Sequence, residues 1–276
     1  MVEVAEQRIH GIAFREALPE GDVESAPVVI AVHGYPESSL MWQPVLPKLA
    51  EAGYRALAPD LPGFGDTGAD RPGTWERQIG NLDRFRRALG VERTALIVHD
   101  WGGLIGLRWA CDNPGAVAAL VVSNTGFFPD GKWHGMARAM RTEGEGEELV
   151  DNTNRELFGQ MLRGISSELT DEALDHYFQA YSDEERRRNQ LDLYRSGDFE
   201  KLEPYEGKLA ELGVPMLILW GENDPFAPVA GAYRFRKEVP DADLVVIDDA
   251  GHFVVADQPE RYAAEVARFL GRVKAG

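Results

Sequence analysis

Short apolar runs, each bounded by turn-forming residues, recur along the chain. A continuous apolar run of this kind is typical of a parallel strand that helices cover on both faces. We expect the opening segment, Val4–Ala17, to add an antiparallel pair at the edge of the sheet. The runs expected to form the parallel strands are Val28–Val32, Ala56–Ala58, Ala95–Val98, Ala119–Val122, Met216–Trp220 and Leu244–Ile247.

Apolar residues at helical spacing lie between these runs. One helix face is marked by apolar residues every three or four positions, at Ile79, Leu82, Phe85 and Leu89. Alternation of strands with helices predicts βαβ units. The expected fold class is therefore α/β, with a mostly parallel, doubly wound sheet.

The alternation stops near Phe128. Residues 129–205 are charged and helix-prone, and the next buried run begins only after Gly213-Val214-Pro215. We therefore expect an inserted helical cap at 129–205, within a core formed by 1–128 and 206–276. Three amphipathic stretches support this prediction: Asn154–Leu162, Asp171–Tyr181 and Asp183–Tyr194.

Composition narrows the class of protein. The 276 residues carry a formal charge of −17, which argues against nucleic acid and anionic membrane surfaces as partners. The single cysteine, Cys111, allows no intrachain disulfide and is more typical of a core residue than of a nucleophile. The first residues contain no apolar signal core, and no run approaches the roughly 18 apolar residues of a membrane span. We expect a soluble, cytoplasmic protein.

One polar residue stands at the abrupt end of a predicted strand. Ala95–Val98 runs into His99-Asp100-Trp101-Gly102-Gly103, and a helical pattern follows at once. Small residues at such a turn let the backbone bend sharply and lift the middle side chain, Asp100, clear of the sheet. The helix N-terminus favours an anion there. Taken alone, Asp100 has a simpler interpretation as a helix N-cap.

Two further motifs favour a chemical role for Asp100. Asp224 follows the strand predicted at Met216–Trp220, and His252 follows the strand predicted at Leu244–Ile247. Doubly wound sheets place their ligands at the carboxyl ends of the strands, so the three side chains should meet at one edge. The chain order of nucleophile, acid and histidine is that of the α/β-hydrolases.

An aspartate can serve as the nucleophile in such a set. With an ordinary pKa of about 3.9, a carboxylate is already an anion at neutral pH and needs no base. It suits attack on a saturated carbon, which would leave a covalent ester on Asp100. His252, oriented by Asp224, would then activate water against the ester carbonyl. The oxyanion so formed requires backbone donors, for which Trp101 and the loop His33–Pro36 are the obvious sources.

The chain resembles the α/β-hydrolase superfamily over nearly its full length. Within it, the resemblance is to the aspartate-nucleophile branch of epoxide hydrolases and haloalkane dehalogenases, closer to the epoxide hydrolases. The matching segments are HGYPESSLMW, DLPGFGDT, VHDWGG, WGENDPF and AGHF. The resemblance implies that Asp100 is the nucleophile, His252 the water-activating base and Asp224 its orienting acid. It also implies an oxyanion hole formed by the N–H groups of Tyr35 and Trp101.

The two activities of this branch differ in what the leaving group needs. An opening epoxide develops an alkoxide that takes a proton, in this family typically from two cap tyrosines. A departing halide binds weakly polar N–H donors, typically a tryptophan after the nucleophile plus an asparagine or a second tryptophan. Many dehalogenases carry asparagine where this chain has Tyr35, and HGYPES resembles the epoxide hydrolases. We therefore favour epoxide hydrolysis, with haloalkane dehalogenation as the alternative.

Candidate proton donors lie in the predicted cap. Tyr194, in Leu-Tyr-Arg, resembles one ring-opening tyrosine. The alternative is a structural tyrosine on a helix face that packs against the core, since the sequence pattern would be the same. The early cap has His134 where the second tyrosine is common, and some bacterial members carry histidine there. His134 is therefore the candidate second donor. The interpretation of His134 as an ordinary surface histidine carries equal weight. Tyr177 and Tyr181, one helical turn apart, are the reserve candidates and expected substrate contacts.

The remaining expectations concern partners. Trp101 and Trp133 are expected to contact the substrate, a small apolar epoxide or halogenated compound, with water as co-substrate. No cofactor is expected and no metal, because no histidine, cysteine and carboxylate cluster shows ligand spacing. A homodimer is left open by the sequence. A non-catalytic binding protein on the same fold is the second alternative, disfavoured because all three catalytic positions are filled.

Overall fold

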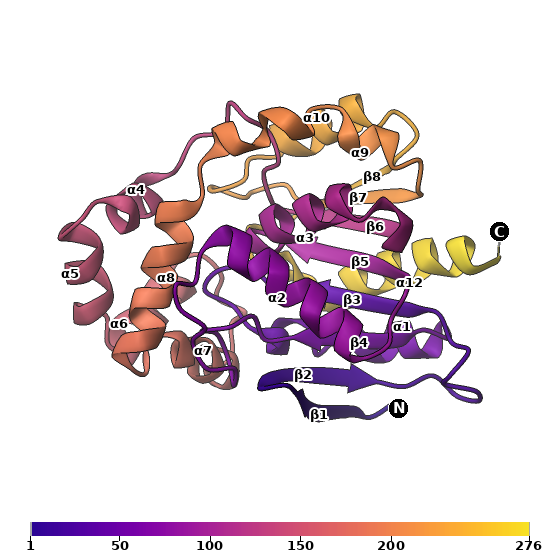
Figure 1. Ribbon diagram of the computed structural model, residues 1–276, viewed down its shortest axis with the longest axis horizontal. Helices are drawn as coiled ribbons and strands as arrows, with labels where there is room; N and C mark the ends of the chain where they lie inside the picture. Colours follow the sequence, from indigo (N-terminus) through magenta and orange to yellow (C-terminus); the bar gives the residue numbers. More distant parts are fainter. Residues whose placement is uncertain (1, 276) are drawn as a thin grey trace.

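The computed structural model describes residues 2–275. Its centre is an eight-stranded sheet in the order β1-β2-β4-β3-β5-β6-β7-β8 (Figure 1). The pairs β1–β2 and β2–β4 are antiparallel, and the other neighbours are parallel. The predicted parallel strands and the antiparallel edge pair are confirmed. The strands are β1 Val4–Ile9, β2 Ile12–Ala17, β3 Val28–Val32, β4 Arg55–Pro59, β5 Thr94–His99, β6 Val117–Ser123, β7 Met216–Gly221 and β8 Asp243–Ile247.

Helices cover both faces of the sheet. In Figure 1, α2 and α3 pack together in front of the sheet, and α12 lies behind it, where it contacts α1. None of the helices within residues 2–275 is both long and apolar enough to cross a membrane. The helices of the core are α1 Leu46–Glu51, α2 Trp75–Ala88, α3 Trp101–Asp112, α9 Lys208–Glu211, α10 Ala230–Glu238, α11 Val254–Asp257 and α12 Pro259–Ala275, with 3₁₀ turns η1 Ser39–Trp42 and η2 Pro114–Ala116.

Between β6 and β7 the chain leaves the sheet and forms a group of helices. Figure 1 shows this group gathered at the end of the sheet toward which β3 and β5 point. The three predicted amphipathic stretches correspond to α6, α7 and α8. We propose that the segment 129–205 acts as a cap over the carboxyl ends of the strands. Its elements are α4 Gly135–Arg141, α5 Glu145–Asn152, α6 Arg155–Arg163, α7 Asp171–Phe178, η3 Gln179–Tyr181, α8 Glu184–Ser196 and η4 Phe199–Tyr205.

The central strand β5 brings the polar turn to this end of the molecule. Every residue of β5 is buried, because helices lie against both faces of the sheet and strands pair with both of its edges. A fully buried strand fixes the direction in which the chain emerges at its carboxyl end. The residue that follows, Asp100, is consequently held at the boundary between sheet and cap.

Candidate active site

Asp100 forms a sharp turn between β5 and α3. Its backbone has φ 48° and ψ −122°, a region that a non-glycine residue enters at a cost of about 1–3 kcal/mol. The two residues that follow β6 hold this turn: the Asn124 carbonyl accepts the Asp100 N–H at 3.2 Å, and the Thr125 hydroxyl donates to the Asp100 carbonyl at 2.6 Å. Strain retained in this way is typical of a functional side chain held in one orientation.

The Asp100 carboxylate faces the loop after β3 rather than its own helix. In the described chain it accepts no capping hydrogen bond from α3, so the N-cap interpretation is wrong. Its Oδ1 accepts the backbone N–H of Tyr35 at 2.7 Å. A Cβ atom at Gly34 would collide with the Asp100 side chain, so only glycine lets this loop approach so closely. The Tyr35 N–H, which the sequence analysis expects to be an oxyanion donor, thus binds the Asp100 carboxylate directly.

His252 and Asp224 form a bonded pair aimed at Asp100. His252 Nδ1 lies 2.8 Å from Asp224 Oδ2, and His252 Nε2 lies 3.6 Å from Asp100 Oδ2. The second distance is too long for a hydrogen bond, so the ring faces the carboxylate without being bonded to it. Burial would lower the pKa of His252, but the charge and hydrogen bond of Asp224 outweigh it, and the pKa is raised above 6.5.

Asp224 is held as an anion by several donors. Its Oδ1 accepts the N–H groups of Phe226 and Ala227 at 2.7 and 2.9 Å, and its Oδ2 also accepts Asn124 Nδ2 at 2.8 Å. Burial would raise the pKa of Asp224, but the adjacent His252 and these hydrogen bonds outweigh burial and lower it. Asn124 is missing from the predicted site. Asn124 directly follows β6 at the same edge of the sheet. A polar residue in that position is the sequence signal by which Asn124 could have been predicted.

A cavity of about 170 Å³, here the cap cavity, lies between Asp100 and the helices above it. Its lining includes five of the residues that the sequence analysis proposed for the site: Asp100, His134, Tyr181, Tyr194 and His252. Because an apolar cavity of about 150 Å³ binds benzene in another protein, the cap cavity has room for a group of phenyl size. Its walls are Tyr35, Pro36, Asp100, His134, Met136, Phe158, Met161, Leu162, Ile165, Tyr181, Tyr194, Phe226, His252 and Phe253.

Three phenol side chains meet in the cap cavity. The hydroxyl groups of Tyr35 and Tyr181 are hydrogen-bonded to each other, and the rings of Tyr35 and Tyr194 pack edge to face at 5.0 Å. Burial raises the pKa of Tyr194 well above 10 and that of Tyr181 to about 12. All of these phenols are therefore protonated at neutral pH. The sequence predicted a role for the Tyr35 N–H but missed the Tyr35 side chain.

A second cavity of about 290 Å³ is lined by Asp100 and by residues of α10. Its wall includes both predicted tryptophans, whose rings stack at 5.4 Å with an angle of 22°. The indole N–H of Trp133 donates to the Gly197 carbonyl at 3.1 Å. The contact of Trp133 with the cavity is consequently made by its ring rather than by a free donor.

His134 and Tyr177 occupy different environments. His134 lines both cavities, and its ring lies 4.9 Å from that of Phe226. Burial lowers the pKa of His134, which favours a neutral imidazole. Tyr177 is instead buried near Glu37, whose charge adds to burial in raising the Tyr177 pKa. We therefore omit Tyr177 from the proposed substrate contacts.

One group of potential metal ligands lies outside the two cavities. Asp60, Asp66 and His176 bring a ligand atom each within 4.8 Å of the others. Both oxygens of Asp60 already accept backbone N–H groups, from Ser39 at 2.7 Å and from Asp66 at 2.9 Å, and His176 Nδ1 lies 2.6 Å from Ser38 Oγ. These contacts indicate a structural role for the group, which attaches α7 to the loops of the core.

Comparisons with known proteins identify the fold family of the chain. Residues 27–259 match a protein family described as "alpha/beta hydrolase fold". The chain is 28% identical to "Epoxide hydrolase 3" of Siraitia grosvenorii, over 91% of this chain and 93% of the relative. It is also 28% identical to a haloalkane dehalogenase of Psychrobacter cryohalolentis, over 97% of this chain and 89% of the relative.

Solved structures share the fold at lower sequence similarity. A haloalkane dehalogenase from Bradyrhizobium elkani superposes with a TM-score of 0.82 at 24% identity, covering 100% of this chain and 99% of that one. An epoxide hydrolase from Vigna radiata superposes with a TM-score of 0.78 at 24% identity, covering 98% of each chain. The sheet order, the inserted helices and the family match agree, and the chain belongs to the alpha/beta hydrolase fold family.

Proposed function

We propose that this protein is an epoxide hydrolase that forms vicinal diols through a covalent ester on Asp100. The observation that carries the proposal is the presence of three buried phenols, Tyr35, Tyr181 and Tyr194, in the same cavity as Asp100. A protonated phenol can give its proton to a developing alkoxide. A halide leaving group needs no proton, so these donors favour the epoxide as substrate.

In the first step, Asp100 Oδ2 attacks one carbon of the epoxide. Tyr35 N–H binds the other oxygen, Oδ1, which leaves Oδ2 as the free nucleophile. The new bond joins Oδ2 to carbon, the carbon–oxygen bond of the ring breaks, and the released alkoxide takes the proton of Tyr194. The product of this step is a hydroxyalkyl ester on Asp100.

In the second step, water hydrolyses the ester. His252 Nε2 accepts a proton from the water as the oxygen attacks Cγ of Asp100, and Asp224 stabilises the imidazolium that results. The negative charge on Oδ1 is bound by the N–H groups of Tyr35 and Trp101, the latter at the start of α3 where helix N–H groups are free. When the intermediate collapses, the bond from Cγ to the alkyl oxygen Oδ2 breaks, and this oxygen takes the proton from His252 as the diol leaves. The proton on the new carboxyl group of Asp100 returns to the Tyr194 phenolate, which restores both side chains.

We propose Tyr181, rather than His134, as the second proton donor. Its hydroxyl is bonded to that of Tyr35, so Tyr35 can donate to Tyr181 while Tyr181 donates to the substrate oxygen. A chain of hydroxyl groups of this kind polarises its terminal donor. His134 lies between the two cavities, and we assign it to their shared wall.

Haloalkane dehalogenation by the same ester route is the second candidate. The stacked pair Trp101 and Trp133 beside Asp100 favours it, since indole N–H groups bind halide. The Trp133 N–H is already bonded to the Gly197 carbonyl, which weakens this candidate. A binding protein without activity is the third candidate, disfavoured by the bonded pair of His252 and Asp224.

A paired assay separates the candidates. Purified protein is incubated with styrene oxide and, separately, with 1-bromobutane, and diol and halide release are measured, with Asp100→Asn as the matched control. We expect diol without halide, and no diol from the control. Halide without diol would establish the dehalogenase instead. Turnover of neither substrate, with no adduct on Asp100, would favour the binding protein.

A further inference from the structure

The two partners of the proposed first step belong to different parts of the molecule. Asp100 projects from the core sheet, whereas Tyr194 projects from α8 in the cap segment. A proton donor misplaced by 1 Å can cost about 100-fold in rate. The spacing of the two groups therefore depends on how α8 is fastened to the core.

One face of α8 binds the backbone of the core segment 62–75. Asn189, Asp192 and Ser196 are spaced by three and four residues, which places them on one side of a helix. Asn189 Nδ2 donates to the Pro62 carbonyl at 2.9 Å, and Asp192 Oδ2 accepts the Gly73 N–H at 3.0 Å. We call Asn189, Asp192 and Ser196 the docking stripe.

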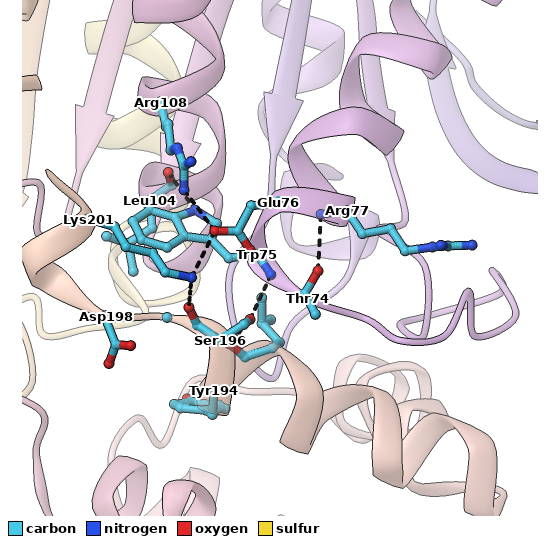
Figure 2. A network of polar contacts seen from close by, with 12 residues as sticks. Thr74, Trp75, Glu76, Arg77, Leu104, Arg108, Tyr194, Ser196, Asp198 and Lys201 are labelled. Atoms are coloured by element: carbon cyan, nitrogen blue, oxygen red, sulfur yellow. Dashed lines mark hydrogen bonds and ion pairs between the residues drawn. The ribbon is translucent and has the colours of Figure 1, made fainter. Parts of the chain in front are cut away.

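The third contact of the docking stripe is made at the start of a core helix. Ser196 Oγ accepts the N–H of Trp75, the first residue of α2, at 2.8 Å (Figure 2). The first N–H groups of a helix have no partner within it, so Ser196 supplies an acceptor that α2 lacks. The bond ties the cap directly to a core helix, two residues beyond Tyr194.

The segment 62–75 is shaped for this contact. A Cβ atom at Gly73 would collide with the Asn189 side chain, so glycine is required for the backbone to lie this close to α8. Arg71 adds a salt bridge to Asp192 at 2.9 Å. The docking stripe therefore recognises the particular backbone conformation of segment 62–75, and the contact is more specific than one between two polar surfaces.

A second group of side chains holds the carbonyl end of α8. Lys201 Nζ donates to the Ser196 carbonyl at 2.7 Å and to Glu76 Oε1 at 2.9 Å, and Arg108 also contacts Glu76 at 3.2 Å. Figure 2 shows this network around Ser196, with Tyr194 on the same turn of the helix. Glu76 and Lys201 are 44% and 38% exposed, and ion pairs so exposed add little to stability.

Tyr194 lies on the other side of the helix from these contacts. It is two residues from both Asp192 and Ser196, which corresponds to a rotation of about 200° around the helix axis. Its side chain lines the cap cavity with Asp100. The docking stripe and the phenol thus occupy opposite sides of one helical turn, and a shift in one displaces the other.

We propose that the docking stripe, and Ser196 above all, positions the Tyr194 hydroxyl against Asp100 for ring opening. The inference rests on the proposed function, since it assigns a positioning role toward the donor of the first step. Asn189, Asp192 and Ser196 are not among the residues that line the two cavities, so in this proposal they act through Tyr194. The expected consequence is a selective effect on ester formation, the step in which Tyr194 takes part.

The test compares Ser196→Ala with Ser196→Thr, which keeps the hydroxyl. Ester formation and ester hydrolysis are measured separately in single-turnover reactions with styrene oxide, by quenching and mass spectrometry of the peptide that contains Asp100. We expect Ser196→Ala to slow ester formation about tenfold and to leave ester hydrolysis unchanged, because hydrolysis depends on His252 and Asp224 in the core. Ser196→Thr should restore most of the rate.

A double-mutant cycle excludes a general loss of structure. In a Tyr194→Phe background, Ser196→Ala should cause no further loss in ester formation, since the group that it positions has been removed. Glu184→Ala, at an exposed position of α8, is the matched control and should leave both steps unchanged. Thermal unfolding of every variant checks that folding is retained.

Three results would overturn the inference. They are an unchanged rate of ester formation in Ser196→Ala, an equal loss in both steps, and a loss of the same size in the Tyr194→Phe background. If Tyr194→Phe reduces ester formation and Ser196→Ala does not, the positioning role alone fails. If Tyr194→Phe has no effect, the donor assignment of the proposed function fails first, and the positioning role with it.

Discussion

His99 and Glu37 form an ion pair inside the core, directly beside the His252–Asp224 pair. His99 Nδ1 lies 2.8 Å from Glu37 Oε2, and the two side chains are 0% and 2% exposed. The alignment of this contact is outside that of a good hydrogen bond, so charge attraction dominates it. His99 Nε2 lies 2.8 Å from the His252 carbonyl. Both ring nitrogens face acceptors, an arrangement that favours the doubly protonated, positively charged ring.

The first prediction concerns stability at alkaline pH. Burial would lower the pKa of His99, but Glu37 outweighs burial and raises it to about 9. A folded-state pKa above the unfolded value of about 6.5 stabilises the fold fully below pH 6.5, and this contribution is lost as pH rises toward 9. Urea unfolding from pH 6 to 10 should show the free energy of unfolding falling in this window. Glu37→Gln should reduce the decrease in the free energy of unfolding over this pH range. An unchanged decrease in this variant would show that the ion pair is not its cause.

The second prediction concerns the covalent intermediate. His252→Ala should form the ester on Asp100 but fail to hydrolyse it, because water then lacks its base. Mass spectrometry after incubation with styrene oxide should show one added substrate mass on the peptide that contains Asp100. Asp100→Asn should show none. An unmodified Asp100 in the His252 variant, across several epoxides, would exclude the covalent route.

The third prediction separates the candidate proton donors. Tyr194→Phe should lower kcat with styrene oxide by about 100-fold, in the range usual for loss of a proton donor. Tyr181→Phe should cost less, about tenfold, and His134→Gln less than threefold. Any bromobutane turnover should be unaffected by Tyr194→Phe, since halide needs no proton. A larger loss in His134→Gln than in Tyr181→Phe would reverse the assignment of the second donor.

The fourth prediction concerns pH and the hydrolytic step. His252 must be neutral to accept a proton, and its pKa in the protein is raised above 6.5. Ester hydrolysis should therefore slow as pH falls through a value above 6.5, with a tenfold decrease per pH unit at the acid end. Ester formation, whose donors are phenols, should keep its rate over the same range. Parallel acid limbs in both steps would contradict the roles assigned to His252 and Tyr194.

The sequence predicted the sheet and the edge at which the candidate site residues meet. Apolar runs identify buried strands because a strand covered on both faces consists mainly of apolar residues. The residues that follow parallel strands meet at one edge of the sheet. Asp100, Asp224 and His252 were found in this way. The N-cap alternative failed for a physical reason, because the strained turn directs the Asp100 carboxylate to the Tyr35 N–H and away from α3.

Contacts made across the cap were harder to predict. The Tyr35 hydroxyl meets that of Tyr181 across 146 residues, and no local pattern reports such a pair. Helical spacing also suggested similar surroundings for Tyr177 and Tyr181. The α-helix α7 ends at Phe178 and a 3₁₀ turn follows, which changes the rotation per residue. Only Tyr181 lines the cap cavity as a result.

The unequal surroundings of the two Asp100 oxygens have a consequence for the atoms of the enzyme. The Tyr35 N–H holds Oδ1, so in the proposed mechanism Oδ2 is the atom that bonds to the substrate and departs in the diol. Water must then supply a replacement. On the proposed route, the first diol from each enzyme molecule carries away an oxygen built in at translation, and later diols carry oxygens that earlier solvent molecules left behind. The nucleophilic oxygen of Asp100 is thus lost to the product and replaced from water in every catalytic cycle.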